Sequence, residues 1–107
     1  MAEKILIVST TFPDAESARR AASELVEARL AACAQVGGAI FSVYRWQGAV
    51  HSGAEYPLLL KTAPSSLEPL KARLFALHPY QCPQFVVLRA GASQDYAAWV
   101  LSSCAEK

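Results

Sequence analysis

The sequence predicts an α+β fold: a ferredoxin-like βαββαβ sandwich with an extended hairpin between its second and third strands and a C-terminal helix. Strand-like apolar runs and segments of helical apolar spacing alternate in the order strand, helix, strand, strand, helix, strand. Two right-handed crossovers joined by a hairpin would place both main helices on one face of an antiparallel sheet. The length of 107 residues suits one domain, residues 1–107.

The first strand and helix are marked by a change from continuous to periodic apolar residues. Ile5-Leu6-Ile7-Val8 is an uninterrupted apolar run, which is typical of a covered central strand. Asp14 follows as a good N-cap, so we expect a helix over about residues 15–30. The apolar face of this helix is formed by Ala18, Ala22, Leu25 and Val26.

The hairpin is the unusual element of the prediction. Its first strand begins over residues 32–36, breaks at Gly37-Gly38 in a bulge or kink, and resumes over residues 40–50. Residues 51–54 would turn the chain, and residues 55–63 would return as the third strand. Both strands exceed the mean length of about five to six residues, so their far ends extend beyond two short helices. The outer part of this hairpin is called the arm below.

Two aromatic residues, Tyr44 and Trp46, share one face of the arm by period-two alternation. They could cover the helices of their own subunit or be buried by another subunit, and the sequence leaves both open. Burial by another subunit would also explain why only 18% of the residues are charged while 53% are apolar.

The second half of the chain supplies a helix, a strand and a final helix. Leucines at spacings of three and four mark a helix over residues 67–77, residues 85–88 form the fourth strand, and residues 95–104 a short helix. The connection before the fourth strand reads His78-Pro79-Tyr80-Gln81-Cys82-Pro83. Its two prolines stiffen the loop and hold an imidazole, a phenol and a thiol close together.

Composition limits the partners and the location. The net charge is +1 and no basic run occurs, which gives no electrostatic case for nucleic acid or for an anionic membrane. Three widely spaced cysteines are expected to be free thiols in a reducing compartment. The apolar run near the start is too short for a signal-peptide core. The expected location is therefore cytoplasmic.

Four separated motifs then carry a resemblance to a known family. They are Arg29-Leu30-Ala31-Ala32-Cys33-Ala34, Ser42-Val43-Tyr44-Arg45-Trp46-Gln47-Gly48, Leu59-Leu60-Lys61-Thr62 and His78-Pro79-Tyr80-Gln81-Cys82-Pro83. In this order they closely resemble the CutA family of divalent-cation tolerance proteins. The resemblance implies a small cytoplasmic homotrimer, similar in architecture to PII-type signalling proteins, with copper binding in some members and no established catalytic reaction. Tyr44, Trp46 and Trp99 are the residues we expect at the trimer interface.

This chain departs from the pattern of that family, where Gly37-Gly38 replaces a proline-glycine pair and three charged positions are lost. Gln47 and Ala49 replace the acid and the base of the usual Trp-Glu-Gly-Lys, and Gln84 replaces the acid that often follows the second proline of the His-Pro-Tyr motif. Hard cations need oxygen anions as ligands. The loss of two carboxylates around one cleft therefore weakens any site for a hard cation.

A site for a soft metal is expected to be weak. Copper or zinc prefers thiolate and imidazole ligands, yet no Cys-x-x-Cys pair occurs and residues 9–13 hold no soft ligand. The remaining ligand candidates are Cys33, His78 and Cys82. Cys33 is more often a packed core thiol, and His78 more often bonds backbone carbonyls at a helix end. No cofactor is obligatory, and copper or another divalent cation is the ion that such a site would take.

A ligand cleft formed by Lys61, Tyr80 and Trp46 is the other candidate site. In the functional interpretation Lys61 and Tyr80, together with His78, donate hydrogen bonds to a small anion in a cleft between subunits. In the structural interpretation Lys61 forms an ion pair with Glu55 or Asp95, and Trp46 is an interface anchor. The structural interpretation is favoured.

The predicted function is that of a non-catalytic trimer of divalent-metal tolerance. The alternative is a PII-like small-molecule signalling or protein-scaffold trimer without a metal role. An acylphosphatase shares the fold but needs an arginine and a phosphate-cradling loop, and residues 9–13 contain neither glycine nor arginine. An RNA-recognition module needs exposed aromatics that residues 55–60 do not supply. No histidine relay to a serine is evident, so we expect no enzyme.

Overall fold

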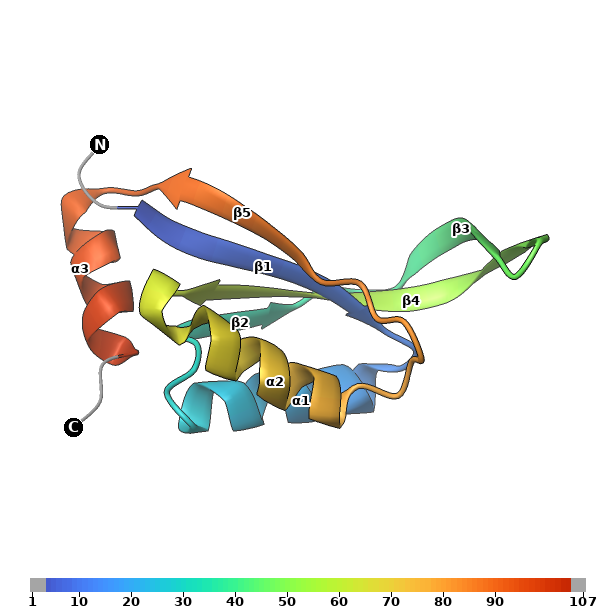
Figure 1. The fold of residues 1–107 in the computed structure, drawn as a ribbon, viewed down its shortest axis with the longest axis horizontal. Helices are drawn as coiled ribbons and strands as arrows, with labels where there is room; N and C mark the ends of the chain where they lie inside the picture. The colour runs from blue at the N-terminus through green and yellow to red at the C-terminus, as the bar shows by residue number, and fades with distance from the viewer. Residues whose placement is uncertain (1–3, 105–107) are drawn as a thin grey trace.

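The computed structural model describes residues 4–104 and confirms the expected α+β class (Figure 1). The first three and the last three residues of the expected domain, 1–3 and 105–107, lie outside the described residues. In chain order the elements are β1 (Lys4–Phe12), α1 (Ala15–Glu27), β2 (Cys33–Val36), β3 (Ile40–Trp46), β4 (Ala49–Thr62), a 3₁₀ turn η1 (Pro64–Ser66), α2 (Leu67–Leu77), β5 (Val86–Gly91) and α3 (Gln94–Ser103).

The sheet is antiparallel throughout, and β4 is the strand that organises it. The strand order is β2-β4-β1-β5, with β3 paired only to the outer part of β4. The 14 residues of β4 therefore serve two structures: residues 56–62 pair with β1, while residues 49–55 pair with β3 alone. The second pairing makes a two-stranded arm that projects from the body of the molecule (Figure 1).

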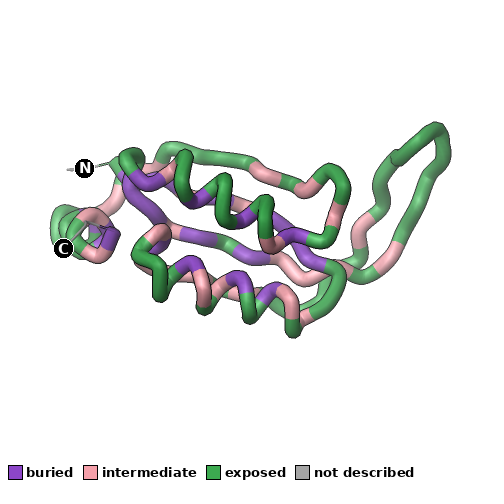
Figure 2. Tube along the Cα trace, turned by 60° about the horizontal axis from the view of Figure 1, so that its bottom comes forward, coloured by how far each residue is buried: buried purple, intermediate pink, exposed green. Residues whose placement is uncertain are grey.

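The core lies between the sheet and helices α1 and α2. Alternate residues of the two central strands point towards these helices, because side chains alternate between the faces of a strand. Figure 2 shows the buried residues gathered in this layer and the arm almost wholly exposed. The core members that are at most 1% exposed are Val8, Phe12, Ala18, Ala21, Leu25, Ala31, Leu58, Leu60, Leu70 and Leu74.

Helix α1 begins where the sequence predicts and ends earlier. The Asp14 carboxylate accepts a hydrogen bond from the backbone N–H of Ser17 at 2.7 Å, which is the expected N-cap. The helix stops at Glu27 because Arg29 adopts a left-handed φ of 62°. The N–H groups of Arg29 and Leu30 then bond back to the carbonyls of Val26 and Leu25, which is a Schellman closure.

The hairpin turn lies at the tip of the arm, and the expected turn at residues 51–54 is wrong. Gln47 and Gly48 have φ values of 53° and 82°, and the flanking Trp46 and Ala49 are paired. Two left-handed residues between paired strands make a tight two-residue turn whose twist matches that of the strands. Residues 51–54 continue β4 instead. The predicted break at Gly37-Gly38 is confirmed, because β2 and β3 are separate strands.

The opposite face of the sheet is mostly open. Helix α3 covers one end of it, where Ala97 and Val100 pack on Ile5. The rest of this open face carries the pairs Ser9–Leu59 and Ile7–Leu88, and Leu59 and Leu88 are 39% and 56% exposed. No helix within residues 4–104 is long and apolar enough to cross a membrane.

Candidate functional site

The histidine of the proline-rich loop has a structural role within the subunit. The His78 ring stacks on Phe12 with centroids 4.2 Å apart, and Nε2 lies 2.7 Å from the carbonyl oxygen of Thr11. The backbone N–H of Tyr80 donates to Nδ1 at 3.2 Å. A ring that accepts at Nδ1 and donates at Nε2 is neutral. Neither nitrogen is left for a metal ion in this conformation.

Burial lowers the pKa of His78 below its ordinary value, although the hydrogen bond to Thr11 and the charge of Glu55 oppose this shift. The prediction that His78 bonds a backbone carbonyl is confirmed, but the carbonyl belongs to β1 and not to the end of α2. The ring is therefore not positioned by the carbonyl groups at the end of α2, and a favourable interaction with the dipole of that helix is not required to explain its place. Its stacking and hydrogen bonds fix the loop that follows, including Tyr80.

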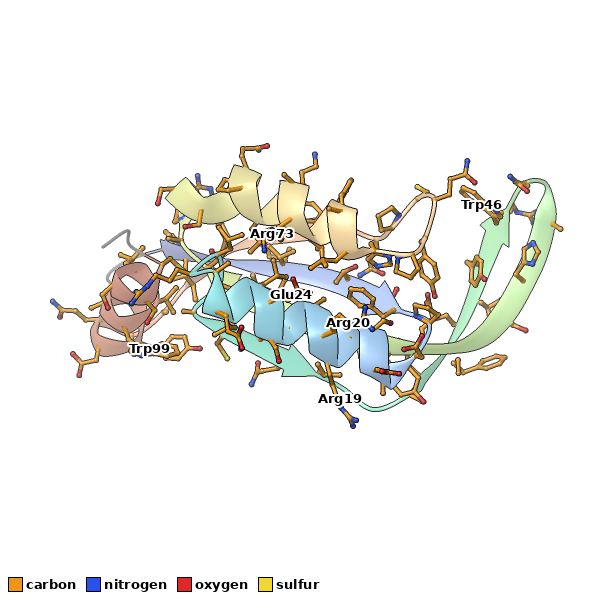
Figure 3. The ribbon with its side chains drawn as sticks, turned by 90° about the horizontal axis from the view of Figure 1, so that it is seen from below. Arg19, Arg20, Glu24, Trp46, Arg73 and Trp99 are labelled. Carbon is orange, nitrogen blue, oxygen red and sulfur yellow. The ribbon has the colours of Figure 1, made fainter. Side chains whose placement is uncertain are left out.

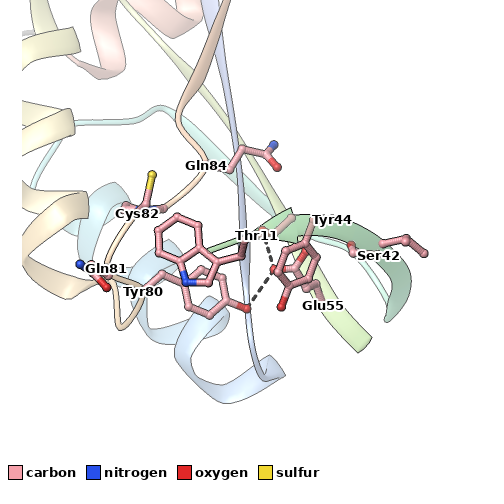
Figure 4. Close-up of a pocket in the computed structure, with 11 residues that line it drawn as sticks. Thr11, Ser42, Tyr44, Glu55, Tyr80, Gln81, Cys82 and Gln84 are labelled. Atoms are coloured by element: carbon pink, nitrogen blue, oxygen red, sulfur yellow. Dashed lines mark hydrogen bonds between the residues drawn. The ribbon is translucent and has the colours of Figure 1, made fainter. Parts of the chain in front are cut away.

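A pocket of about 540 Å³ lies between this loop and the arm. The loop contributes Tyr80, Gln81 and Cys82 to one wall, and the arm contributes Ser42 and Tyr44. Figure 4 shows the Tyr80 ring directed towards Glu55. Trp46 and Glu55 also line the pocket. The stiff loop and the arm thus enclose one site from segments that are far apart in the sequence.

The polar centre of the pocket is the carboxylate of Glu55. The hydroxyl groups of Thr11 and Tyr80 both donate to its Oε2 atom, at 3.1 and 2.9 Å (Figure 4). Burial raises the pKa of Tyr80, and the hydrogen bond to Glu55 and its negative charge raise it further. Tyr80 is therefore a neutral hydrogen-bond donor over the ordinary pH range.

The arm residues reach the pocket because of the strand register. Ser42 is opposite Gly53, Tyr44 is opposite His51, and paired residues share one face of a sheet. The Tyr44 and His51 rings stack with centroids 5.7 Å apart. The next pair on this face, Ser42 and Gly53, is small compared with the pairs on either side of it.

Within one subunit the structure does not bring Lys61 to Tyr80 and Trp46. Lys61 lies six residues beyond Glu55 along β4, a separation of about 20 Å at the rise of an extended strand. Its ammonium group donates to Oε1 of Gln35. The ion pair expected with Glu55 or Asp95 is therefore replaced by a hydrogen bond to an amide, and the charged group in the pocket is an anion.

The three cysteines lie in three different environments. Cys33 is half-buried in β2 and contacts Tyr96, whose pKa is raised by burial and by this thiol. Cys82 is exposed at the pocket, and buried Cys104 places its sulfur 3.6 Å from the Thr62 hydroxyl. No group of three histidine, cysteine or acidic side chains that could hold a metal ion occurs among residues 4–104. One subunit alone does not assemble Cys33, His78 and Cys82 into a site.

The three expected interface residues are all substantially exposed in the subunit. Tyr44, Trp46 and Trp99 are 50%, 39% and 47% exposed. Figure 3 places Trp46 near the tip of the arm and Trp99 on α3, at opposite ends of the molecule. Contacts that bury all three must therefore involve both ends of the subunit.

Sequence reasoning missed Glu55 and Thr11 as site residues. Glu55 was expected only as an ion-pair partner of Lys61, and the serine-threonine run before Asp14 was expected to be a loop. Strand β1 in fact continues to Phe12, so that Thr11 pairs with Pro57 next to the start of the arm. The available sequence signal was the placement of polar residues at alternate positions, Ser9 and Thr11 in the first strand and others in the return strand.

The fold and the site define a small sheet protein whose pocket is enclosed by a projecting arm. Residues 6–103 match the family model described as CutA1 divalent ion tolerance protein. The chain belongs to this family.

The relatives agree in sequence and in structure. The divalent-cation tolerance protein CutA of Thermus thermophilus is 44% identical over 95 residues, which are 88% of this chain and 92% of that protein. The crystal structure of CutA1 from Ehrlichia chaffeensis has a TM-score of 0.90 at 30% identity and covers 99% of this chain and 100% of that chain. The Thermus structure has a TM-score of 0.89 at 41% identity, covering 92% and 97%.

Composition and family resemblance suggested a cytoplasmic location, and this prediction is wrong. An Arabidopsis thaliana relative, 37% identical over 92% of this chain and 54% of its own length, is named as chloroplastic. A structural neighbour from Archaeoglobus fulgidus is named as periplasmic. Free thiols and a short apolar first strand therefore do not fix the compartment of such a protein.

Proposed function

We propose that the protein is a non-catalytic homotrimer that contributes to divalent-cation tolerance, with weak binding of copper. Membership of the CutA1 family supports the role in tolerance. The observation that carries the assembly is the apolar outer face of the arm. Phe41, Val43 and Val50 are 74%, 62% and 62% exposed on a hairpin that no other described element covers.

An exposed apolar hairpin of this kind needs a partner surface. Isolated two-stranded hairpins are marginally stable in water. Contiguous exposed apolar patches on soluble proteins mark association sites. The open sheet face, with Leu59 and Leu88 exposed, offers a second surface of the same character. Association of three copies through these surfaces would cover both.

The environment of His78 supports the absence of catalysis. Its Nε2–H is directed to a backbone carbonyl and its Nδ1 accepts from a backbone N–H. A general base needs a free nitrogen within hydrogen-bond reach of a nucleophile. Cys82 is close in sequence but exposed at the surface of the loop. These two residues therefore do not form a nucleophile–base pair.

Weak copper binding would use thiols that reach the surface of the subunit. Cys33 lies on the open face and Cys82 at the pocket, so copies of either could approach one another in an assembly. Soft thiolates suit copper(I). The separation of these thiols within one subunit is the reason for expecting low affinity.

Two measurements test this proposal. Light scattering behind a sizing column should give three times the mass of one chain at micromolar concentration. Calorimetric titration of the reduced protein with copper(I) should show weak binding that Cys33→Ser or Cys82→Ser reduces, while Cys104→Ser, a buried control near the Thr62 hydroxyl, does not. A monomer contradicts the assembly, and absence of copper binding contradicts the metal role.

The pocket favours a second candidate function, a trimer that binds a small molecule. A volume of about 540 Å³ and one hydrogen-bonded carboxylate are typical of a ligand site. The chemistry of such a ligand can be argued from the side chains that line the pocket.

A further inference from the structure

We propose that the pocket between the arm and the proline-rich loop binds a small organic cation, an alkylammonium or quaternary ammonium compound, against Glu55 and the rings of Tyr44, Trp46 and Tyr80. This site rests on the second candidate function, and the groups that it assigns to the ligand, Glu55 and three aromatic rings, are not the thiols proposed to bind copper, although Cys82 lines the same pocket. Three observations carry it: the sign of the charge in the pocket, the distribution of hydrogen bonds, and the aromatic walls.

The charge in the pocket is negative and uncompensated. Glu55 is the charged residue among the described residues that line it, and no lysine or arginine among them does so. Arg45 lies on the arm as well, but strand alternation directs it to the face opposite Tyr44 and Trp46. A partly buried carboxylate without a cationic partner favours a positively charged ligand.

The hydrogen bonds orient the carboxylate and leave one of its oxygens for a ligand. Thr11 and Tyr80 both donate to Oε2 of Glu55. Oε1 is therefore the atom that can meet an ammonium group. The same two hydroxyl hydrogens are no longer available to an anion, and the Gln84 amide donates to Ser9 at 2.9 Å. The other side-chain donors that line the pocket, on Ser42, Tyr44, Trp46 and Gln81, carry no positive charge, so an anionic ligand would face the Glu55 carboxylate without a cationic partner.

Aromatic rings complete the environment for a cation. Tyr44, Trp46 and Tyr80 line the pocket, and their electron-rich faces attract cations within about 6 Å. Stacking on His51 holds the Tyr44 ring in place. Aromatic walls around a carboxylate are the usual recognition of alkylated ammonium groups. An organic cation suits this aromatic pocket because methyl groups can partly cover its positive charge.

A bare metal ion fits this pocket less well. Calcium takes about six to eight oxygen ligands, whereas a single carboxylate lines the described pocket. Copper or zinc would need more thiolate or imidazole groups than Cys82 alone. An alkylammonium ion needs one carboxylate and an apolar surround, which are both present.

Two small residues, Ser42 and Gly53, are paired on the strand face that carries Glu55, and Ser42 lines the pocket. A Cβ atom added at Gly53 would meet no heavy atom within 4 Å, and Gly53 shares a strand face with Glu55 two residues away. A larger side chain at Gly53 would therefore extend from this strand face, opposite the lining residue Ser42, without disturbing the core. This position provides a way to block the site while keeping its charge.

The test compares two probes of nearly equal shape on the assembled protein. Choline carries a quaternary ammonium group, and 3,3-dimethyl-1-butanol is its neutral carbon isostere. In calorimetry or ligand-observed NMR we expect choline to bind at least about tenfold more tightly than the isostere, because of its charge. Equal binding of the two probes, or no binding of choline at millimolar concentration, would overturn the proposal.

Three variants locate the site. Glu55→Gln should weaken choline binding by about tenfold or more, and Gly53→Val should abolish it, while the mass of the assembly stays unchanged. Glu68→Gln removes the same charge from the exposed first turn of α2 and should have no effect. Choline binding that survives both pocket variants overturns the proposal. Copper(I) titration of the same variants should match the parent protein, which separates this site from the metal role.

Discussion

At the scale of single residues, Arg29 shows how a side chain can occupy a position that favours glycine. Its φ of 62° closes α1, and residues with a Cβ atom pay about 1–2 kcal/mol in this region. The guanidinium group donates a hydrogen bond to the carbonyl oxygen of Ser103, but at 3.4 Å this bond is long and offsets little of that cost. The backbone preference is therefore expected to outweigh the side-chain contact.

We expect Arg29→Gly to be more stable than Arg29→Ala by about 1 kcal/mol. Both variants lose the contact with Ser103, so the difference isolates the left-handed backbone. Urea unfolding at one fixed protein concentration measures it, because association shifts the apparent stability. Equal stability of the two variants would show that the closure is not strained.

His78 makes the stability depend on pH. Its folded pKa is lowered from 6.5, so the unfolded chain binds a proton more readily than the folded one. The stabilisation is present above pH 6.5 and is lost as the pH falls from there through the folded pKa. Urea unfolding between pH 7.5 and 5.5 should show this loss, and His78→Gln should reduce it.

The control for this prediction is His51→Gln. His51 is the other histidine of the chain and is exposed on the arm. If His51→Gln reduced the dependence as much as His78→Gln, the buried ring would not be its source.

At the scale of elements, the periodic segments could be predicted from the sequence and the turn could not. Asp14 and the leucines of α2 define helices by local rules, and the helices form where expected. The turn was placed near Gly53 because glycine usually marks a chain reversal. Gly53 instead lies inside β4, and the reversal uses Gln47, a residue type that is uncommon at positive φ.

The pocket was predictable only in part. Tyr80 and Trp46 were expected in a ligand cleft because they stand in compact motifs, whereas Cys82 was expected only as a weak metal ligand. Glu55 was not, because its contact with Tyr80 depends on the register of β4 against β1 and on the path of the loop. Lys61 was grouped with Tyr80 by its motif, yet the length of β4 separates them. Spacing along a chain does not determine distances across a sheet.

The two-residue turn gives a prediction about the arm. Gly48→Ala should lower the free energy of unfolding by about 1 kcal/mol, because φ at this position is 82°. Gly53→Ala, in the same hairpin but with open space around the added Cβ atom, is the matched control and should cost less. Urea unfolding of both variants at one concentration measures the difference. A larger loss for Gly53→Ala would contradict the assignment of the turn.

At the scale of the whole molecule, the apolar face of the arm is expected to hold the assembly together. Phe41→Ser removes the most exposed of its large apolar side chains, at 74% exposure. Each fully buried side chain of this kind contributes about 1.5–3 kcal/mol, so the variant should dissociate at higher protein concentration than the parent. Light scattering across a dilution series measures this.

Val26→Ser is the control for the assembly, because Val26 is 38% exposed on α1, away from the arm. Its dissociation should follow that of the parent protein. If Phe41→Ser associated as the parent does, the outer face of the arm would not be the contact surface.

The arm also contributes Tyr44 and Trp46 to the wall of the pocket. These two rings are the ones we expect between subunits, so ligand occupancy and oligomerisation draw on the same side chains. Thermodynamic linkage makes any such coupling reciprocal. By this reciprocity, a compound that strengthens the assembly from this cavity must itself bind more weakly as the protein is diluted, and a compound that loosens the assembly must bind more tightly. The protein's own abundance would then regulate its affinity for the compound.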